Sequence, residues 1–160
     1  MEREKAMKIV LGCDHAGFLL KPAILEAIRK AGHKVLDVGT DSTAPVDYPD
    51  IVRKVGEAIL EKKADRGILI CGSGVGACIA ANKIHGIYAA VCHDTYSAHQ
   101  GVEHDDMNVL CLGSRIIGPE LARELVLVFL SARFSKEERH RRRVKKTRAI
   151  ESEFEGKAAR

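Results

Sequence analysis

The sequence predicts a single α/β domain in which a five-stranded parallel sheet is covered by helices on both faces. Short runs rich in Ile and Val alternate with segments whose apolar residues recur every three or four positions, which is typical of such a sheet. The 160 residues, 46% of them hydrophobic, are enough for one domain with a sizeable core. No internal repeat, linker or change of composition indicates a second domain, so residues 1–160 are taken as one unit.

Five strand–helix units can be placed in order along the chain. The strands are expected at residues 8–13, 34–38, 67–71, 88–92 and 109–112, and the helices at residues 17–31, 48–63, 75–85, 95–103 and 119–132. The first helix keeps Leu20, Ile24 and Ile28 on one side and ends before Gly32, a residue that favours a helix end. The last of the five begins at Gly118-Pro119, because proline is favoured in the first helical turn.

Cysteine usage and the N-terminal residues indicate a reducing compartment. The five cysteines are an odd number without C-x-x-C spacing, so we expect free thiols. The charged residues 1–7 are followed by no signal-like segment, and no run approaches the roughly 18 apolar residues of a membrane span. A cytoplasmic protein without a membrane partner is therefore expected. Aromatic residues are only 4% of the chain, which argues against base-stacking surfaces and favours a small polar ligand.

The third strand ends in a thiol followed by glycines. Residues 67–71 are an apolar run that ends at Cys71, and Gly72, Gly74 and Gly76 follow at alternate positions. This pattern places Cys71 where a buried strand gives way to a loop and a helix, the position at which open α/β sheets bind ligands. Backbone N–H groups in such a loop can hold a phosphate or an oxyanion. We expect a reactive thiol beside an anion-binding loop.

Polar clusters lie at the ends of other predicted strands. Residues 13–15 follow the first strand, residues 47–50 precede the second helix, residues 93–94 follow the fourth strand, and residues 103–108 lead into the fifth. Because residues just beyond parallel strands lie along one edge of a sheet, we expect these clusters to converge. Each also has a structural interpretation, since short acidic and His side chains in such positions commonly cap helices or form turns.

Residues 136–148 contain eight Lys or Arg and two Glu, a local charge of +6 in a chain whose net charge is +4. The apolar spacing there predicts a C-terminal basic helix that packs on the domain. Three interpretations stay open for its charges: a solvated helix face, a tail that follows nucleic-acid phosphates, or arginines that bind the phosphate of a small substrate. The absence of aromatic residues from the cluster disfavours nucleic acid.

Metal and dinucleotide sites are weakly indicated. His104 stands beside two aspartates, but no His-x-His or His-x-x-x-His spacing supports a metal site, and none is expected. The pattern Gly72-x-Gly74-x-x-Ala77, with Asp94 further on, loosely fits a dinucleotide-binding loop. It follows the third strand rather than the first, and the chain has no room for a separate substrate domain. We expect no cofactor.

Five groups of segments in this order resemble the type B ribose-5-phosphate isomerases, and the match extends over residues 7–150. They are Cys13-Asp14-His15-Ala16-Gly17-Phe18, Val46-Asp47-Tyr48-Pro49-Asp50, Ile70-Cys71-Gly72-Ser73-Gly74-Val75-Gly76 with Ile79-Ala80-Ala81-Asn82-Lys83, Asn108-Val109-Leu110 with Gly113-Ser114-Arg115, and Arg139-His140 with Arg143-Val144. The resemblance implies a Rossmann-like three-layer α/β/α sandwich. It also implies metal-free interconversion of phosphorylated aldoses and ketoses, in homodimers or homotetramers whose sites are shared between subunits.

The resemblance implies a role for each site residue. Cys71 would be the base that moves a proton between C1 and C2 through an enediolate, Ser73 would move protons between the sugar oxygens, and Asp14 and His104 would open the sugar ring. The loop residues Gly72, Gly74, Val75 and Gly76 would hold the reacting oxygens, Tyr48 would line the sugar pocket, and the phosphate would be bound by His15, Arg115, Arg139 and Arg143, the last two from a neighbouring subunit.

Two positions bear on how far the resemblance extends. Some members carry a glutamate base in the glycine loop, but Ala77 occupies that position here, which leaves the role to Cys71. The residue after His104 is usually asparagine, and here it is Asp105, whose carboxylate would repel an enediolate unless protonated or turned away. We expect ribose 5-phosphate as substrate, with a tetrose, allose or galactose phosphate as the alternative.

Overall fold

The structure is a computed structural model that describes residues 5–157. It has five strands, one 3-10 turn and six α-helices over this range, and the predicted order of strands and helices is confirmed. The elements are β1 (Lys8–Cys13), a 3-10 turn (Phe18–Leu20), α1 (Lys21–Lys30), β2 (Lys34–Asp37), α2 (Tyr48–Leu60), β3 (Arg66–Cys71), α3 (Val75–Ala81), β4 (Ala89–Val91), α4 (Thr95–Asp105), β5 (Val109–Gly113), α5 (Pro119–Ser131) and α6 (Glu138–Phe154).

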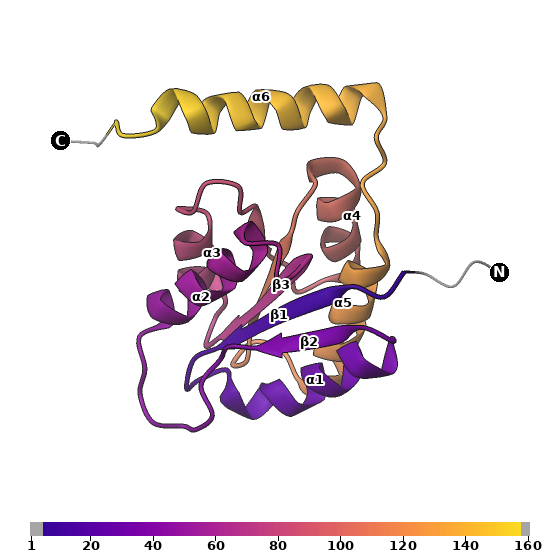
Figure 1. The fold of residues 1–160 in the computed structure, drawn as a ribbon. Helices are drawn as coiled ribbons and strands as arrows, with labels where there is room; N and C mark the ends of the chain where they lie inside the picture. Colours follow the sequence, from indigo (N-terminus) through magenta and orange to yellow (C-terminus); the bar gives the residue numbers. More distant parts are fainter. Residues whose placement is uncertain (1–4, 158–160) are drawn as a thin grey trace.

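All five strands are parallel and lie in the order β2-β1-β3-β5-β4. The register pairs Cys13 with Ile70 and Cys71 with Gly113, so the central strands β1, β3 and β5 end at nearly the same level. Helices α2 and α3 pack together on one face of the sheet, and α1, α4 and α5 pack on the other (Figure 1). The predicted three-layer α/β/α sandwich is confirmed.

The apolar strands are explained by burial on both faces. Along β3, Ile68 and Ile70 belong to the cluster beneath α1, α4 and α5, whereas Leu69 and Cys71 belong to the cluster beneath α2 and α3. A strand between two helix layers has no solvent-facing side, so it reads as a continuous apolar run rather than an alternating one. Phe129 on α5 is completely buried in the larger cluster.

Helix α3 is shorter than predicted, because it ends at Ala81 rather than at residue 85. The side chain of Asn82 binds the backbone of Ala89 twice: its Oδ1 accepts from the N–H at 2.9 Å and its Nδ2 donates to the carbonyl at 2.8 Å. Gly86 then adopts φ +87°, a conformation that favours glycine. These local bonds replace the last helical turn and direct the chain into β4.

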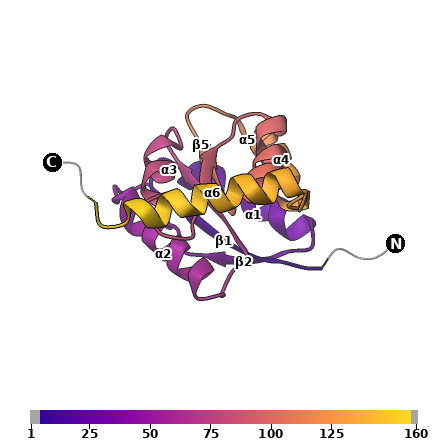
Figure 2. The same cartoon turned by 90° about the horizontal axis from the view of Figure 1, so that it is seen from above.

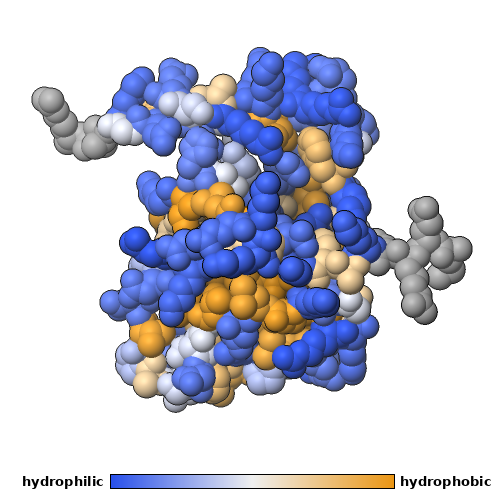
Figure 3. Space-filling model, viewed as in Figure 1, coloured by the Kyte–Doolittle hydropathy of each residue, from blue (hydrophilic) through white to orange (hydrophobic). Residues whose placement is uncertain are grey.

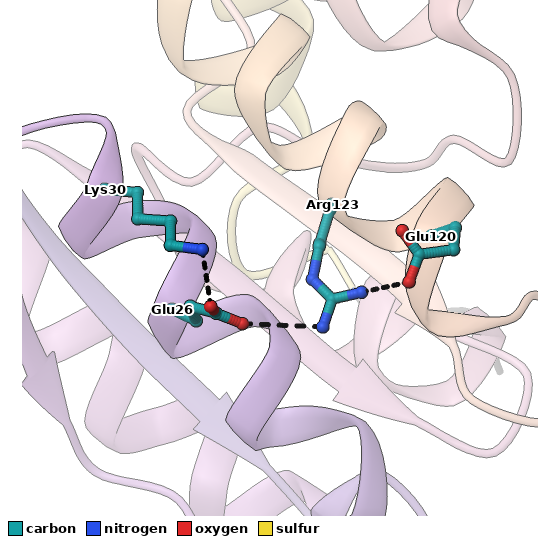
Figure 4. A network of polar contacts seen from close by, with 4 residues as sticks. All are labelled: Glu26, Lys30, Glu120 and Arg123. Carbon is teal, nitrogen blue, oxygen red and sulfur yellow. Dashed lines mark hydrogen bonds and ion pairs between the residues drawn. The ribbon is translucent and has the colours of Figure 1, made fainter.

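Polar contacts at the surface join helices that are distant in sequence. Glu26 on α1 accepts from Lys30 at 2.6 Å and contacts Arg123 of α5 at 3.5 Å, while Arg123 also pairs with Glu120 (Figure 4). The hydrogen bond from Lys30 is the main cause that lowers the pKa of Glu26. Exposed pairs of this kind stabilise a fold only slightly, so the shared apolar cluster of α1 and α5 contributes more to holding the two helices together.

Helix α6 is the predicted basic helix, and it lies across the body from α4 toward α3 (Figure 2). Its buried residues are His140 and Val144, and most of its outer surface is hydrophilic (Figure 3). Arg148 binds Asp106 at 2.7 Å, and Glu151 accepts from the hydroxyl of Tyr88 at 2.9 Å. Because Tyr88 and Asp106 lie just before β4 and β5, α6 is attached at the amino ends of these strands.

None of the helices within residues 5–157 is long and apolar enough to cross a membrane. The cysteines at 13, 71, 78, 92 and 111 are free thiols, as predicted. Burial raises the pKa of Cys13 and of Cys92 to about 11. A hydrogen bond from Cys111 lowers the pKa of the less buried Cys78 to about 7.

Candidate active site

Cys71 is the last residue of β3 and stands at the carboxyl edge of the sheet. Its carbonyl accepts from the N–H of Ser114 at 2.8 Å, and the carbonyl of Gly72 accepts from the N–H of Arg115 at 3.0 Å. The sulfur accepts from the N–H of Gly74 at 3.1 Å. This bond, together with the two backbone bonds to the loop after β5, fixes the position of the sulfur beside the glycine loop.

The glycine loop is closely packed. Gly74 has φ +81°, and a Cβ there would lie 3.2 Å from the Leu112 carbonyl carbon. A Cβ on Gly76 would lie 2.8 Å from Cζ of Tyr48, so this tyrosine lies directly against the loop. Only glycine leaves room at these two positions. Ser73 and Val75 are in the same turn, where the Ser73 hydroxyl accepts from the N–H of Val75 at 3.2 Å.

Asp14 and His15 stand at the same edge, after β1. The carboxylate of Asp14 accepts from the N–H of Gly17 at 2.9 Å, so it also caps the following turn, as its structural interpretation predicts. Nδ1 of His15 accepts from the N–H of Val46 at 3.2 Å. In the neutral ring the proton therefore resides on Nε2, which is free to donate to a ligand.

Arg115 completes this group of residues. Its Nη1 would lie 3.3 Å from a Cβ on Gly72, which places the guanidinium beside the cysteine loop. A hollow of about 520 Å³ opens next to it and is lined in part by His15, Ser114 and Arg115. Two side chains that donate hydrogen bonds at the mouth of a hollow can bind an anion such as a phosphate.

His104, Asp105, Arg139 and Arg143 form a second group, which lies at the other end of the strands. Asp105 ends α4, four residues before Val109, and the register pairs Val109 with Gly67, four residues before Cys71. At about 3.3 Å per residue, the strand alone separates the two groups by about 13 Å. The expectation that all polar clusters converge on one edge is wrong, because residues 103–108 lead into a strand rather than out of one.

His104 is held by neighbours on two helices. Nε2 of the Gln100 amide lies 2.9 Å from Nδ1 of His104. The ring of His140 on α6 stacks on His104 with centroids 4.0 Å apart, and Nδ1 of His140 contacts the Ser135 hydroxyl at 2.5 Å. Burial, and then the nearby His104, lower the pKa of His140. This packing fixes the plane of the His104 ring.

Asp105 is exposed beside a cavity of about 290 Å³ between α6 and the body of the domain. Its neighbour Asp106, and not Asp105, pairs with Arg148. Asp106 has φ +56° and terminates α4, so the Arg148 pair holds the turn that presents His104 and Asp105. Arg139 and Arg143 are exposed on the first turns of α6, and Arg139 binds Glu137 at 2.9 Å.

His93 and Asp94 have structural roles at the carboxyl edge. Nε2 of His93 accepts from the N–H of Gly113 at 2.9 Å and so holds the end of β5. Asp94 accepts from the N–H of Ser97 at 2.7 Å and caps α4, and this bond lowers its pKa. Within residues 5–157 no group of three His, Cys, Asp or Glu side chains is arranged to hold a metal ion.

Comparison with known proteins gives a consistent result. The family described as Ribose/Galactose Isomerase matches residues 9–147. The chain is 46% identical over 144 residues to ribose-5-phosphate isomerase B of Escherichia coli, with 90% of this chain and 96% of that protein covered. It is 44% identical over 130 residues to D-erythrulose-4-phosphate isomerase of Pectobacterium atrosepticum, covering 80% and 85%. The structure of Clostridium thermocellum ribose-5-phosphate isomerase B superposes with a TM-score of 0.89 at 47% identity, covering 92% and 99%.

Proposed function

The chain belongs to the ribose/galactose isomerase family, and we propose that it interconverts D-ribose 5-phosphate and D-ribulose 5-phosphate, with Cys71 as the carbon base. The observation that carries the proposal is the Cys71 sulfur at the carboxyl edge of the sheet, 3.1 Å from the N–H of Gly74. The thiolate takes the proton from C2 of the open-chain aldose, an enediolate forms, and the thiol returns the proton to C1. No cofactor takes part in these steps, because the proton only moves between adjacent carbons.

The groups around Cys71 suit the charge that develops in this reaction. Negative charge appears on the sugar oxygens as the enediolate forms, and N–H groups of the glycine loop can donate to it. The hydroxyl of Ser73 lies in the same turn and can pass a proton between the two oxygens. The ring of Tyr48 packs against Gly76 and forms a wall of the sugar pocket.

The phosphate is assigned to the hollow beside Arg115. His15 can donate from Nε2, because its Nδ1 is occupied by Val46, and Arg115 offers a charged and planar set of donors. Arg139 and Arg143 supply further positive charge in this proposal. They lie with His104 at the opposite end of the strands in the same chain, so they cannot reach the same sugar as Cys71 without a second chain.

We therefore propose a homodimer in which the Cys71 site of one copy lies against the His104 group of the other. In a two-fold dimer the carboxyl edge of one copy meets the His104 group of the other, and the symmetry completes two equivalent sites. The four-carbon and five-carbon substrates of the relatives are short, so both halves must lie within a few ångströms of the sugar. The free thiols further support a reducing, cytoplasmic location.

A tetrose phosphate is a second candidate substrate. One relative that is 44% identical is named D-erythrulose-4-phosphate isomerase. In this chain Asp105 presents an exposed carboxylate in the His104 group, which changes the surroundings of the reacting end of the sugar. Rates with four-, five- and six-carbon sugar phosphates on the wild-type protein separate these candidates, and the highest kcat/KM identifies the substrate.

The carbon base is tested with Cys71→Ala. We expect loss of solvent deuterium incorporation at C2 and of net isomerisation, with sugar-phosphate binding largely kept, because the variant removes only the proton acceptor. Cys78→Ala serves as the matched control, since this thiol is on α3 and outside the proposed site. If Cys71→Ala still exchanges the C2 proton at the wild-type rate, Cys71 is not the base.

A further inference from the structure

Gln100 forms a hydrogen bond with the imidazole ring of His104. Its amide nitrogen lies 2.9 Å from Nδ1 of His104, one helical turn along α4. An amide nitrogen can only donate, so Nδ1 is the acceptor and the neutral His104 ring carries its proton on Nε2. The stacked His140 closes one face of the ring, and Ser135 in turn holds His140. Nε2 is the ring atom that these contacts leave available for a ligand.

We propose that Gln100 is a positioning residue for ring opening, which directs the Nε2 proton of His104 to the ring oxygen of a cyclic sugar phosphate. The proposal rests on the proposed function and deepens it. In the neutral ring the Gln100 NH2 group donates to Nδ1. When His104 is protonated, the same amide can turn over so that its carbonyl accepts from Nδ1–H. A glutamine therefore keeps the ring oriented in both protonation states.

The ring-opening step balances with the groups available. The bond between C1 and the ring oxygen breaks, the imidazolium of His104 gives its Nε2 proton to that oxygen, and the carboxylate of Asp14 takes the proton of the C1 hydroxyl as the carbonyl forms. His104 becomes neutral with its remaining proton on Nδ1, where the Gln100 carbonyl accepts it, and Asp14 becomes protonated, so charge is conserved. Orientation of Nε2 matters only in this step, because the later proton transfer between C1 and C2 uses Cys71.

Because ring opening and proton transfer between C1 and C2 use different residues, a role of Gln100 in ring opening can be distinguished from a merely structural role. Ribose 5-phosphate has a free C4 hydroxyl and is largely a five-membered ring. Erythrose 4-phosphate carries its phosphate on C4 and cannot close a five- or six-membered ring, so it needs no ring opening. A defect confined to ring opening must slow the first substrate and leave the second nearly unchanged.

The variant Gln100→Met keeps the size of the side chain and removes both its donor and its acceptor. We expect kcat for ribose 5-phosphate to fall about tenfold to a hundredfold, within the range that general acid catalysis supplies. The rate with erythrose 4-phosphate should stay within about twofold of wild type, as should deuterium incorporation from solvent into the acyclic ribulose 5-phosphate. Gln100→Glu can still accept from Nδ1–H and should retain most of the ribose 5-phosphate activity.

Thr95→Met is the matched control, because it places the same side chain on the exposed first turn of α4. Equal slowing of the cyclic and acyclic substrates by Gln100→Met would overturn the positioning role, and so would unchanged rates with both. The failure of the proposed function is distinct, since the wild-type protein would then not turn over ribose 5-phosphate. Circular dichroism of the variant identifies a folding defect, and Gln100→Glu then carries the test alone: slowing of ribose 5-phosphate and erythrose 4-phosphate to the same extent by this variant contradicts the proposal.

Discussion

The proposed site has two halves that are built in different ways: the carboxyl-edge half around Cys71, and the second group around His104, Asp105, Arg139 and Arg143, called here the α6 half. Cys71, Asp14 and Arg115 follow strand ends, and backbone hydrogen bonds between neighbouring loops hold them, such as Ser114 N–H to the carbonyl of Cys71 at 2.8 Å. The other half consists of side chains on two helices that meet through the His104–His140 stack. Backbone bonds between strand ends allow little movement, whereas helix-borne side chains move with their helix.

The two halves also differ in the chemical groups that they contain. The carboxyl edge already brings together a thiol, a glycine loop, an acid and two anion-binding side chains. The α6 half presents exposed charges, Asp105, Arg139 and Arg143, with a cavity but without a carbon base of its own. In the proposed mechanism the first half therefore determines the reaction, and the second adds phosphate binding and ring opening from another copy.

Mixing two inactive variants is the strongest test of whether the two halves of a site come from different copies. Cys71→Ala and His104→Ala should each abolish ribose 5-phosphate isomerisation as separate proteins. After unfolding and refolding at equal concentration, half of the dimers are mixed and each has one intact site, so about one quarter of wild-type activity should return. An assay of the refolded mixture decides the matter. If no activity returns although mixed dimers form, both halves act within one chain or in another arrangement.

Arg143→Ala removes one of the charged donors assigned to the phosphate. We expect KM to rise about tenfold to a hundredfold, which corresponds to about 1.5–3 kcal/mol for a charged hydrogen bond, with kcat less affected. Steady-state kinetics measure both parameters. The neighbouring Arg142→Ala, on the same exposed helix, should change KM little. An unchanged KM in Arg143→Ala would remove this arginine from the phosphate site.

Asp105→Asn replaces a carboxylate by an amide that can donate to the enediolate. We expect kcat for ribose 5-phosphate to rise about fivefold, because removing one repulsive contact at about 4 Å in a wet site is worth about 1 kcal/mol. The same variant should be assayed with erythrose 4-phosphate. A fall in kcat with both sugars would show instead that the carboxylate contributes to the reaction.

The smallest expected effect concerns stability at the α6 half. The pKa of His140 in the folded protein is lowered below its ordinary value of 6.5, so the unfolded chain binds more protons in mild acid. Stability is then fully present above pH 6.5 and is lost as the pH falls toward the folded pKa. The thermal midpoint of His140→Phe should fall less between pH 7.5 and pH 5.5 than that of the wild type. The exposed His85→Gln should behave like the wild type, and an equal fall in all three proteins would contradict the role of His140.

Much of the fold was predictable because its signals are local. Buried strands such as β3 appear as apolar runs, and Pro119 marks the start of α5. The end of α3 was not predictable, since it depends on the bonds between Asn82 and Ala89, whose backbone must first lie beside it. Helix periodicity contains no information on such contacts with a later strand.

The carboxyl-edge half of the site could be placed from the sequence, because the residues that follow parallel strands share an edge whatever the order of the strands. The positions of His104 and the α6 arginines could not be predicted in this way. They depend on the direction in which α6 crosses the body and on the contacts of His140 and Arg148. Side chains on two helices meet through packing between distant segments, and no local pattern specifies which end of the sheet that packing selects.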